Sequence, residues 1–550
     1  MRKPRWIVAL VLTSSMLLDA QSNAVPGMDV SLGDLGPINA LGRSGTFPNG
    51  TNGAAGETTA CNVGSIIVDW FDGDSTVPMN DDHPWIAFIA AKETDERFVQ
   101  ISDRSYIKAG FGVFAQSVCT PCTSCGICER LDPGCSDTYT VGINGNRFWL
   151  APPEEINPWL GLWNGIGSLF DRGEPPVAPP NDTDGVRSFT FSMGNALGPV
   201  AHRIVISDTE LNDPSATFWY QGMYVVKGEP EANRENNMAT RVMTPAWNGS
   251  SWNLSPPFGV SANGTVLNRW GGATLTSGTN GPDDGRVYVA VKVTGPTDGL
   301  YHYEYALHNR DNNRGVGELR IPICPLARVL NAGFHDIDDL AANQWSVAVG
   351  ATEVVFTTPD NPLRWNSIYN FWFDSDAAPV PSMMALDAFD AGPGAASFNI
   401  STSTPGGLYN VYLGDGCSFT SPPVLGAFGS PAQPTLGNAS YGYTNAGVNP
   451  GSVSVLFGGF QAGTVQVGGG CSVYMALPGM PPVITLNAVL ADGSGVANHP
   501  LAIPNNVALE GLDANVQAIS VRPSGGPFQS MFEFSSGWQV RIGSAVSDCP

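Results

Sequence analysis

The sequence predicts a mainly β, multidomain protein built as antiparallel β-sandwiches with long loops and a cysteine-dense N-terminal segment. Composition is the first reason, because 65 glycines and 44 prolines stand beside only 14% charged residues. Many short strands joined by turns have this composition, and long helices do not. The second reason is a series of short stretches in which apolar and polar residues alternate between turn residues. The third is the length of 550 residues, which predicts about two to four domains.

The N-terminus has the pattern of a secretory signal peptide over residues 1–24. Basic residues come first, residues 6–18 are uncharged and mostly apolar, and Ser22 and Ala24 occupy the −3 and −1 positions of a cleavage site expected within residues 20–24. The alternative is a membrane anchor, but the apolar run is shorter than the about 20 residues that span a bilayer. No second long apolar segment follows. We therefore expect a secreted or cell-surface protein whose mature chain has no transmembrane segment.

The segment after the signal peptide lacks a periodic apolar pattern. Residues 25–60 are rich in Gly, Asn, Ser, Thr and Pro, and they predict a flexible leader. A cysteine-rich β region is expected over residues 61–185. Within it, residues 84–91 are apolar throughout, which is typical of a strand buried on both faces.

Strand patterns repeat with turn residues between them over residues 186–378. Residues 187–193 and 216–220 alternate, and residues 301–307 place three tyrosines on one face and His302, Glu304 and Ala306 on the other. Many short strands at this spacing predict an antiparallel sandwich domain.

The composition changes again toward the C-terminus. Residues 379–407 are interpreted as a junction, and residues 408–550 are rich in Gly, Ser, Val, Leu and Pro with few charges. Residues 451–457 indicate a strand, and residues 538–543 alternate as a closing strand would. These features predict a separate C-terminal β-sandwich domain.

Several passages of the sequence have a familiar form, namely residues 133–139, 143–146, 301–309, 318–323, 332–336 and 363–376. These passages resemble uncharacterised secreted β-rich proteins of planctomycete-type bacteria. The C-terminal part is similar to a β domain found at the ends of such proteins, through Gly416-Cys417, Gly470-Cys471 and residues 503–506. One departure is Thr138, where those proteins usually have proline. The resemblance covers most of residues 61–545 and implies a β architecture and export from a bacterium, but it implies no activity.

Four cysteines, Cys119, Cys122, Cys125 and Cys128, follow one another at two-residue gaps. A bacterial iron–sulfur site has a longer final gap followed by proline, whereas Glu129 follows here. A four-cysteine zinc site usually has two pairs separated by a longer arm. An exported chain forms disulfides readily, so disulfides are favoured over metal binding or redox chemistry.

The ten cysteines fall into groups along the chain. With Cys61 and Cys135 the N-terminal group is even in number, and its pairing order is open. Cys417 and Cys471, each preceded by glycine, are the natural pair of the C-terminal domain. Cys324 and Cys549 are left, either paired with each other or free.

Calcium is the only cofactor that the sequence suggests. Asp69, Asp72 and Asp74 lie close together in a turn-rich stretch, and hard oxygen ligands in loops suit Ca²⁺. The spacing does not match a calcium-binding loop with its distal glutamate. Turn-forming aspartates on an acidic surface are the favoured interpretation.

Motifs for hydrolysis are absent from the sequence, which has neither His-Glu-x-x-His nor Gly-x-Ser-x-Gly. A glycosidase with paired carboxylates remains open, because its two acids can be far apart in the sequence. Glu304 would be the first candidate, with Asp374 or Asp376 as its partner. We favour the alternative that Glu304 is a solvent-facing strand residue, and we assign no catalytic residue.

Tryptophans in loop-like surroundings are the candidate ligand-binding residues. Trp159, Trp163 and Trp252 lie among Gly, Asn, Ser and Pro. Exposed rings of this kind stack on sugars or pack against a partner protein. The favoured alternative is that they cover a thin sandwich core.

The net charge of the chain excludes some classes of binding partner. The formal net charge of −23 repels phosphate backbones and anionic lipid, so nucleic acid is not an expected partner. We predict a secreted or cell-surface, non-enzymatic β protein with a structural, adhesive or extracellular binding role. Its expected partners are an extracellular polysaccharide or a cell-surface protein. The alternatives are a carbohydrate-active hydrolase with an accessory sandwich and a calcium-dependent adhesion module.

Overall fold

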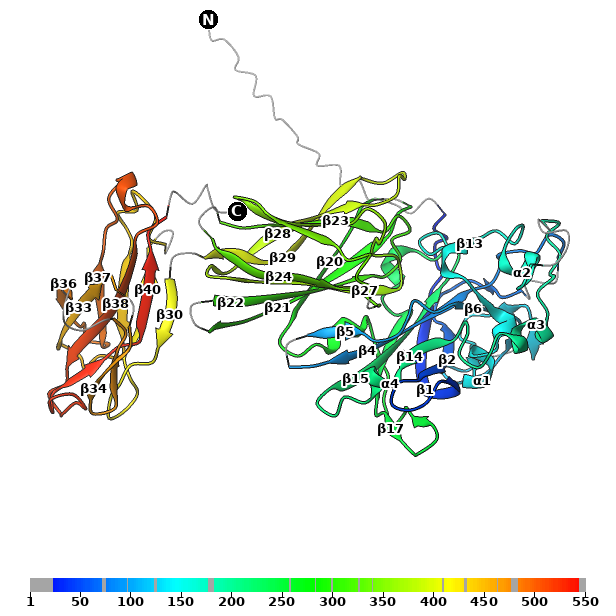
Figure 1. Ribbon diagram of the computed structural model, residues 1–550, viewed down its shortest axis with the longest axis horizontal. Coiled ribbons are helices and arrows are strands. Elements are labelled where there is room, and N and C mark those ends of the chain that lie inside the picture. The colour runs from blue at the N-terminus through cyan, green and yellow to red at the C-terminus, as the bar shows by residue number, and fades with distance from the viewer. Residues whose placement is uncertain are drawn as a thin grey trace, which may run out of the picture.

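The computed structural model shows antiparallel β-sheets in three units that follow one another in a row (Figure 1). We call them the first unit (residues 23–270), the middle unit (274–407) and the C-terminal unit (410–543). The description covers residues 23–543 except 72–75, 96, 123–125, 177–182, 257–258, 282, 298–299, 325–326, 339, 408–409, 430–432, 462 and 476–482. No helix within this description is long and apolar enough to cross a membrane.

Two sheets form the first unit. One sheet contains β1 (Val30–Ser44), β2 (Thr51–Asn62), β10 (Ser136–Tyr139) and β14 (Ile204–Ser207). The other contains β4 (Trp85–Glu93), β5 (Phe98–Gln100), β6 (Ile107–Ala109), β11 (Leu150–Ala151), β15 (Thr217–Val225), β16 (Met238–Met243) and β19 (Ala262–Asn263).

Short elements complete this unit. Its two-stranded ribbons pair β3 (Val68–Asp69) with β9 (Arg130–Leu131), β7 (Val113–Phe114) with β8 (Ile127–Cys128), β12 (Ile156–Asn157) with β13 (Leu162–Trp163), and β17 (Ala246–Trp247) with β18 (Trp252–Asn253). Its helices are α1 (Val141–Asn144), α2 (Leu169–Arg172), α3 (Phe191–Ala196), α4 (Asp208–Leu211), η1 (Arg147–Trp149), η2 (Pro153–Glu155), η3 (Glu231–Asn233) and η4 (Val266–Arg269).

Strand β4 confirms the prediction of a strand buried on both faces. Ile86 and Phe88 point into the core between the two sheets of the first unit. Trp85 and Ile89 point into a second core on the opposite side. The uninterrupted apolar run arises because β4 lies between two cores.

Residues 25–60 are not a flexible leader, as the sequence suggested, because they contain β1 and most of β2. Leu32, Leu35 and Ile38 of β1 are fully buried. The register of β1 against β2 shifts at three places, and each shift interrupts the two-residue alternation that identifies a strand. Glycine here allows close packing, since a Cβ on Gly56 would lie 2.9 Å from a ring atom of Tyr220.

The middle unit is a sandwich of two five-stranded sheets. One has the order β20 (Thr274–Thr279), β21 (Arg286–Thr297), β22 (Leu300–Asn309), β27 (Ser367–Ser375) and β24 (Val329–His335). The other has the order β25 (Ser346–Val349), β26 (Glu353–Thr357), β23 (Val316–Pro322), β28 (Ala378–Ala388) and β29 (Ser397–Gly407). The alternation predicted for residues 301–307 is confirmed, because Tyr303 and Tyr305 enter the core between the sheets while Ala306 faces away from it.

Strand pairing differs from the predicted boundaries at two places. β15 and β16, expected in a domain over residues 186–378, extend the sheet of the first unit, since β15 pairs with β4 along its full length. Residues 379–407, expected to be a junction, form β28 and β29 of the middle sandwich. Proline has no backbone N–H, so it is tolerated in a strand where no neighbouring strand needs a hydrogen bond from it. Pro379 and Pro381 lie at the end of β28 that pairs only with β29, because β23 pairs with the other end of β28. Alternation identifies a strand but not its partner.

The C-terminal unit is a smaller sandwich, as predicted. Its main sheet contains β30 (Asn410–Gly414), β40 (Gly537–Arg541), β38 (Asp513–Val521), β33 (Val453–Gly459), β36 (Ile484–Leu490) and β39 (Phe532–Phe534). The facing sheet contains β31 (Val424–Phe428), β32 (Gly442–Ala446) and β37 (Val496–Pro500), and a ribbon pairs β34 (Val465–Gly468) with β35 (Cys471–Val473). Helix η5 (Val507–Leu509) lies between β37 and β38. The closing strand predicted at residues 538–543 corresponds to β40.

Disulfides, predicted in preference to metal or redox chemistry, are confirmed. Cys61 pairs with Cys119, Cys122 with Cys135, and Cys417 with Cys471 as expected. Cys128 and Cys324 are also disulfide-bonded, and no cysteine within the described ranges is a free thiol. Cys125 and Cys549 lie outside the described residues.

The first and middle units share a buried interface. The core that contains Trp85 and Ile89 of β4 also contains Tyr288 of β21, Ala306 of β22 and Ile368 of β27. The outer face of the β21–β22–β27 sheet is therefore covered by the first unit. Two neighbouring units move relative to each other by default unless a hydrophobic interface of this kind joins them.

Ion pairs around the buried side chains of Arg310 and Asp311 reinforce the same interface. The side chain of Arg310, which follows β22 and is 1% exposed, pairs with Glu231 at 3.2 Å and Glu235 at 3.2 Å in the first unit. It also pairs with Asp311 at 3.0 Å, and Arg234 of the first unit approaches the same Asp311 at 3.0 Å. Charges removed from water are stable only when they are paired, so this network fixes the relative position of the two units.

Candidate binding groove

A cavity opens along the interface between the first and middle units. We call it the interface groove, and its volume is about 600 Å³. The first unit contributes Arg104, Pro153, Glu154 and Ile156. The middle unit contributes Asn313, Ile337, Asp338, Asp360, Asn361, Pro362, Arg364, Trp365, Tyr369 and Asp390. Ligand sites occur preferentially between units, and their volumes run from about 300 to 1,000 Å³.

The floor of the groove is built from interlocking segments of the two units. The indole N–H of Trp365 donates to the carbonyl of Pro153 at 3.0 Å, and Nε of Arg104 donates to the carbonyl of Trp365 at 2.9 Å. The next residue, Asn366, has φ of 57°, in the left-handed region that asparagine tolerates better than most residues. Its side-chain amide donates to the carbonyl of Phe88 at 3.1 Å. These contacts hold the floor in place.

One wall of the groove is organised around Asn361. Its Oδ1 accepts the hydroxyl of Tyr369 at 2.8 Å, and its Nδ2 donates to Asp336 at 2.6 Å and to the carbonyl of Asn343 at 3.0 Å. Burial raises the pKa of Asp336 above its usual range. The side chains of this wall are thus fixed by one another rather than by solvent.

The rim of the groove carries both signs of charge. Arg104 is ion-paired with Glu154, and Arg364 is ion-paired with Asp390. Asp338 and Asp360 add two further carboxylates, which makes four carboxylates against two guanidinium groups among the lining residues. Asp360 is exposed and has no partner within the described part of the chain.

The carboxylates suggested for glycoside hydrolysis lie elsewhere and are engaged in ion pairs. Glu304 is fully buried rather than solvent-facing, and it accepts both Nε and Nη2 of Arg97, at 2.7 and 2.9 Å. Asp374 accepts from Nδ1 of His302 at 2.7 Å. Asp376 accepts from the backbone and Nε of Arg328, both at 2.8 Å. Because the first unit covers Glu304, no substrate reaches it in this structure.

The cluster of His302, Glu304 and Asp374 makes stability depend on pH. The hydrogen bond to Glu304 and then that to Asp374 raise the pKa of His302 above its usual range. A raised pKa means that the stabilisation is fully present below about pH 6.5 and is lost as the pH rises through the folded-state pKa. We expect H302Q to lose on the order of 1 kcal/mol at pH 6 and little at pH 9, since His302 is partly exposed and its ion pairs are screened.

Urea denaturation of wild type and H302Q at both pH values measures this effect. Other groups titrate in the same range, so the informative quantity is the difference between the two proteins. An equal difference at both pH values would show that His302 does not titrate against these carboxylates.

The tryptophans suggested as sugar platforms are core residues, not exposed loop rings. Trp159, Trp163 and Trp252 are 2%, 7% and 4% exposed. The guanidinium of Arg234 covers the ring of Trp159 at 4.7 Å. The indole N–H of Trp252 donates to Asp208 at 2.9 Å. Their loop-like sequence surroundings reflect short irregular segments that fold over the sandwich.

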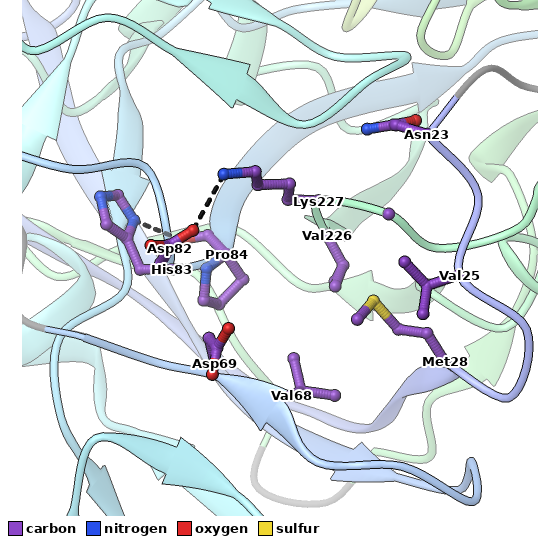
Figure 2. Close-up of a pocket in the computed structure, with 11 residues that line it drawn as sticks. Asn23, Val25, Met28, Val68, Asp69, Asp82, His83, Pro84, Val226 and Lys227 are labelled. Carbon is purple, nitrogen blue, oxygen red and sulfur yellow. Dashed lines mark hydrogen bonds and ion pairs between the residues drawn. The ribbon is translucent and has the colours of Figure 1, made fainter.

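The acidic stretch suggested for calcium borders a separate cavity of about 200 Å³ (Figure 2). Asp69 is exposed there, whereas Asp72 and Asp74 lie outside the described residues. Partial removal from water where Asp69 borders the cavity, together with the neighbouring Asp82, raises the pKa of Asp69. The ammonium of Lys227 lies 2.9 Å from Asp82 and 2.6 Å from Asp81. No group of three metal-ligating side chains was found among the described residues, and calcium binding stays a prediction.

The same cavity has an apolar side. Figure 2 shows Val25, Met28, Val68 and Val226 opposite the charged residues. The backbone N–H of Val25 donates to the carbonyl of Gly228 at 2.7 Å, so the segment that follows the expected signal peptide packs against the first unit.

Comparisons with known proteins do not identify this chain. No protein-family model matches it, and no curated protein matches it. Among solved structures it is similar to the crystal structure of the major pilin subunit of Bacillus cereus, with 9% sequence identity and a TM-score of 0.17. That match covers 57% of this chain and 76% of the pilin. Identity and TM-score this low do not establish a shared fold.

Proposed function

We propose that this chain is an exported, non-enzymatic β protein with a structural and ligand-binding role outside the cytoplasm. The observation that carries the proposal is the buried interface between the first and middle units. An apolar core and the buried ion pair between Arg234 and Asp311 cross it, so the two units form one stiff body that holds a groove open. A rigid scaffold of this kind suits the presentation of a binding surface.

The disulfides support the compartment. Cys61–Cys119, Cys122–Cys135 and Cys417–Cys471 distribute covalent links over the first and C-terminal units. Disulfides persist in oxidising compartments and are rare in the cytoplasm. They agree with the signal peptide that the sequence predicts over residues 1–24, whose cleavage stays a prediction.

Fractionation of cells that produce the full chain tests the proposal. We expect the protein in the extracellular or surface fraction, and treatment with an alkylating reagent before reduction should leave its cysteines unmodified in a mass spectrum. A matched chain without residues 1–24 should stay inside the cell. Recovery of the full chain in the cytoplasm with alkylated cysteines would refute export.

A hydrolysis assay separates this proposal from the carbohydrate-active hydrolase. Because Glu304 is covered and ion-paired, we expect no release of reducing ends from soluble polysaccharides. Release of reducing ends by the wild type that E304Q abolishes would make the chain an enzyme. Release that E304Q leaves unchanged would place catalysis at another site and would equally refute the non-enzymatic role.

A further inference from the structure

We propose that the interface groove binds a neutral, hydroxyl-rich ligand, which is the chemistry of an uncharged extracellular polysaccharide. This inference rests on the proposed function and names the ligand class of the groove described above. The proposal rests on the lining of the groove, in which hydrogen-bond donors and acceptors lie beside apolar residues.

Donors and acceptors lie side by side in the groove. Each rim ion pair, Arg104 with Glu154 and Arg364 with Asp390, presents a guanidinium donor next to a carboxylate acceptor. Asp360 adds a carboxylate without a partner in the described part of the chain. A hydroxyl group both donates and accepts, so a chain of hydroxyls can use neighbouring groups of both kinds.

Apolar surface accompanies these groups. Pro153, Ile156, Ile337 and Pro362 line the groove between the charged side chains. A sugar ring has C–H faces that need apolar contact and hydroxyl edges that need hydrogen bonds. Charged and amide side chains make up most of the lining, and Ile337 is the most exposed of the apolar residues among them.

The charge balance argues against anions. The lining has four carboxylates against two guanidinium groups, and both guanidinium groups are already paired. The chain as a whole has a net charge of −23. A phosphate group or an acidic polysaccharide would thus meet repulsion both locally and at long range.

The charge balance also disfavours cations. A lysine-rich peptide would use only the carboxylates, and two of the four, Glu154 and Asp390, already have an arginine partner. Displacing those arginines would leave guanidinium groups facing the ligand with the same sign of charge. A neutral ligand avoids both costs.

The groove is formed before a ligand arrives. Asn361 and Tyr369 are fixed by hydrogen bonds within the middle unit, and Trp365 is fixed by a hydrogen bond to Pro153 of the first unit. A site that needs little ordering loses less free energy on binding. This matters because single contacts between proteins and uncharged sugars are weak.

Titration calorimetry on the intact protein tests the inference. The probes are short soluble oligomers of cellulose, xylan, mannan and starch, an oligomer of galacturonic acid, and oligolysine. We expect at least one neutral oligomer to bind and galacturonate not to bind. D360A removes a carboxylate acceptor from the groove and should weaken the neutral ligand at least about tenfold, which is the effect of losing one hydrogen bond to a charged group.

Two variants serve as controls. E510A removes one exposed carboxylate from the C-terminal unit and should leave binding unchanged. W247A changes a half-buried ring that lines a different cavity of about 460 Å³. It should also leave binding unchanged.

The groove assignment is overturned if no neutral oligomer binds, if oligolysine binds instead, or if W247A rather than D360A abolishes binding. Each of these outcomes leaves the proposed export intact, because cell fractionation tests export separately. A cytoplasmic protein that nevertheless binds neutral sugars through Asp360 would refute export and preserve the groove.

Discussion

Replacement of Arg310 by alanine is expected to lower the free energy of unfolding by about 3–5 kcal/mol, the usual effect of removing one partner from a buried ion pair. The side chain of Arg310 is 1% exposed, and that of its partner Asp311 is 4% exposed. Without Arg310, the buried carboxylate of Asp311 keeps only Arg234 as a cationic partner across the interface. R310M should be destabilised as well, because methionine restores volume but not charge.

R320A is the matched control for this prediction. Arg320 pairs with two carboxylates, Glu318 and Asp387, each at 2.8 Å, where Arg310 pairs with three, and its side chain is 31% exposed. Water screens such pairs, so the expected loss is at most about 1 kcal/mol. Urea denaturation of the two variants measures the contrast. Equal losses for R310A and R320A would mean that the interface network does not join the units.

Replacement of Cys417 and Cys471 together by alanine is expected to destabilise the C-terminal unit by about 4 kcal/mol. The two residues are 54 positions apart, and removal of a cross-link over a loop of that length restores this much chain entropy to the unfolded state. The C-terminal unit has a small core and depends on the cross-link more than a larger unit would.

Calorimetry distinguishes the affected unit. We expect separate transitions for the C-terminal unit and for the body formed by the first and middle units. The double variant at Cys417 and Cys471 should lower the midpoint temperature of the C-terminal transition alone. The matched change at Cys61 and Cys119, which are 58 positions apart, should lower only that of the other transition. A shift of both transitions by either variant would show that all three units unfold together.

Much of the fold could be predicted because buried strands leave a direct trace in the sequence. Residues 84–91 are apolar throughout because β4 lies between two cores, and residues 301–307 alternate because β22 lies between one core and the first unit. The uninterrupted run reflects burial on both faces, and the alternation at residues 301–307 has the two-residue period of the strand. A local pattern of this kind needs no knowledge of the rest of the chain.

Predictions failed where packing replaced the local pattern. The bulges of β1 interrupt alternation, and Gly56 of β2 is required by the close approach of Tyr220 rather than by flexibility. Residues 187–193 alternate but are not a strand. Thr190 accepts a hydrogen bond from the backbone of Met193 at 3.2 Å and caps α3, while Phe191 is exposed.

The interface groove could not be predicted from the sequence. Trp365 and Pro153 meet across 212 positions, and neither has a neighbour that marks a binding site. The residues that did attract attention for their chemistry, Glu304 and Trp159, are buried. A cluster formed by residues of two units depends on how the units pack against each other. Such packing produces no repeating pattern of apolar and polar residues in the sequence.

The position of β1 has a consequence for the order of events during synthesis. The backbone N–H of Val30 donates to Glu229 at 2.6 Å, across 199 positions, and Ala54 of β2 pairs with Ile204 of β14. At about 5–20 residues per second, roughly 10–40 s pass between the emergence of Val30 and that of Glu229. β1 and β2 can pair with each other at once, but the later partners of both strands, Glu229 and β14, are still missing while the chain lengthens. The first unit cannot complete its fold until these residues have been synthesised. Until then the chain is incompletely folded, and a translocation channel accepts a chain in that form.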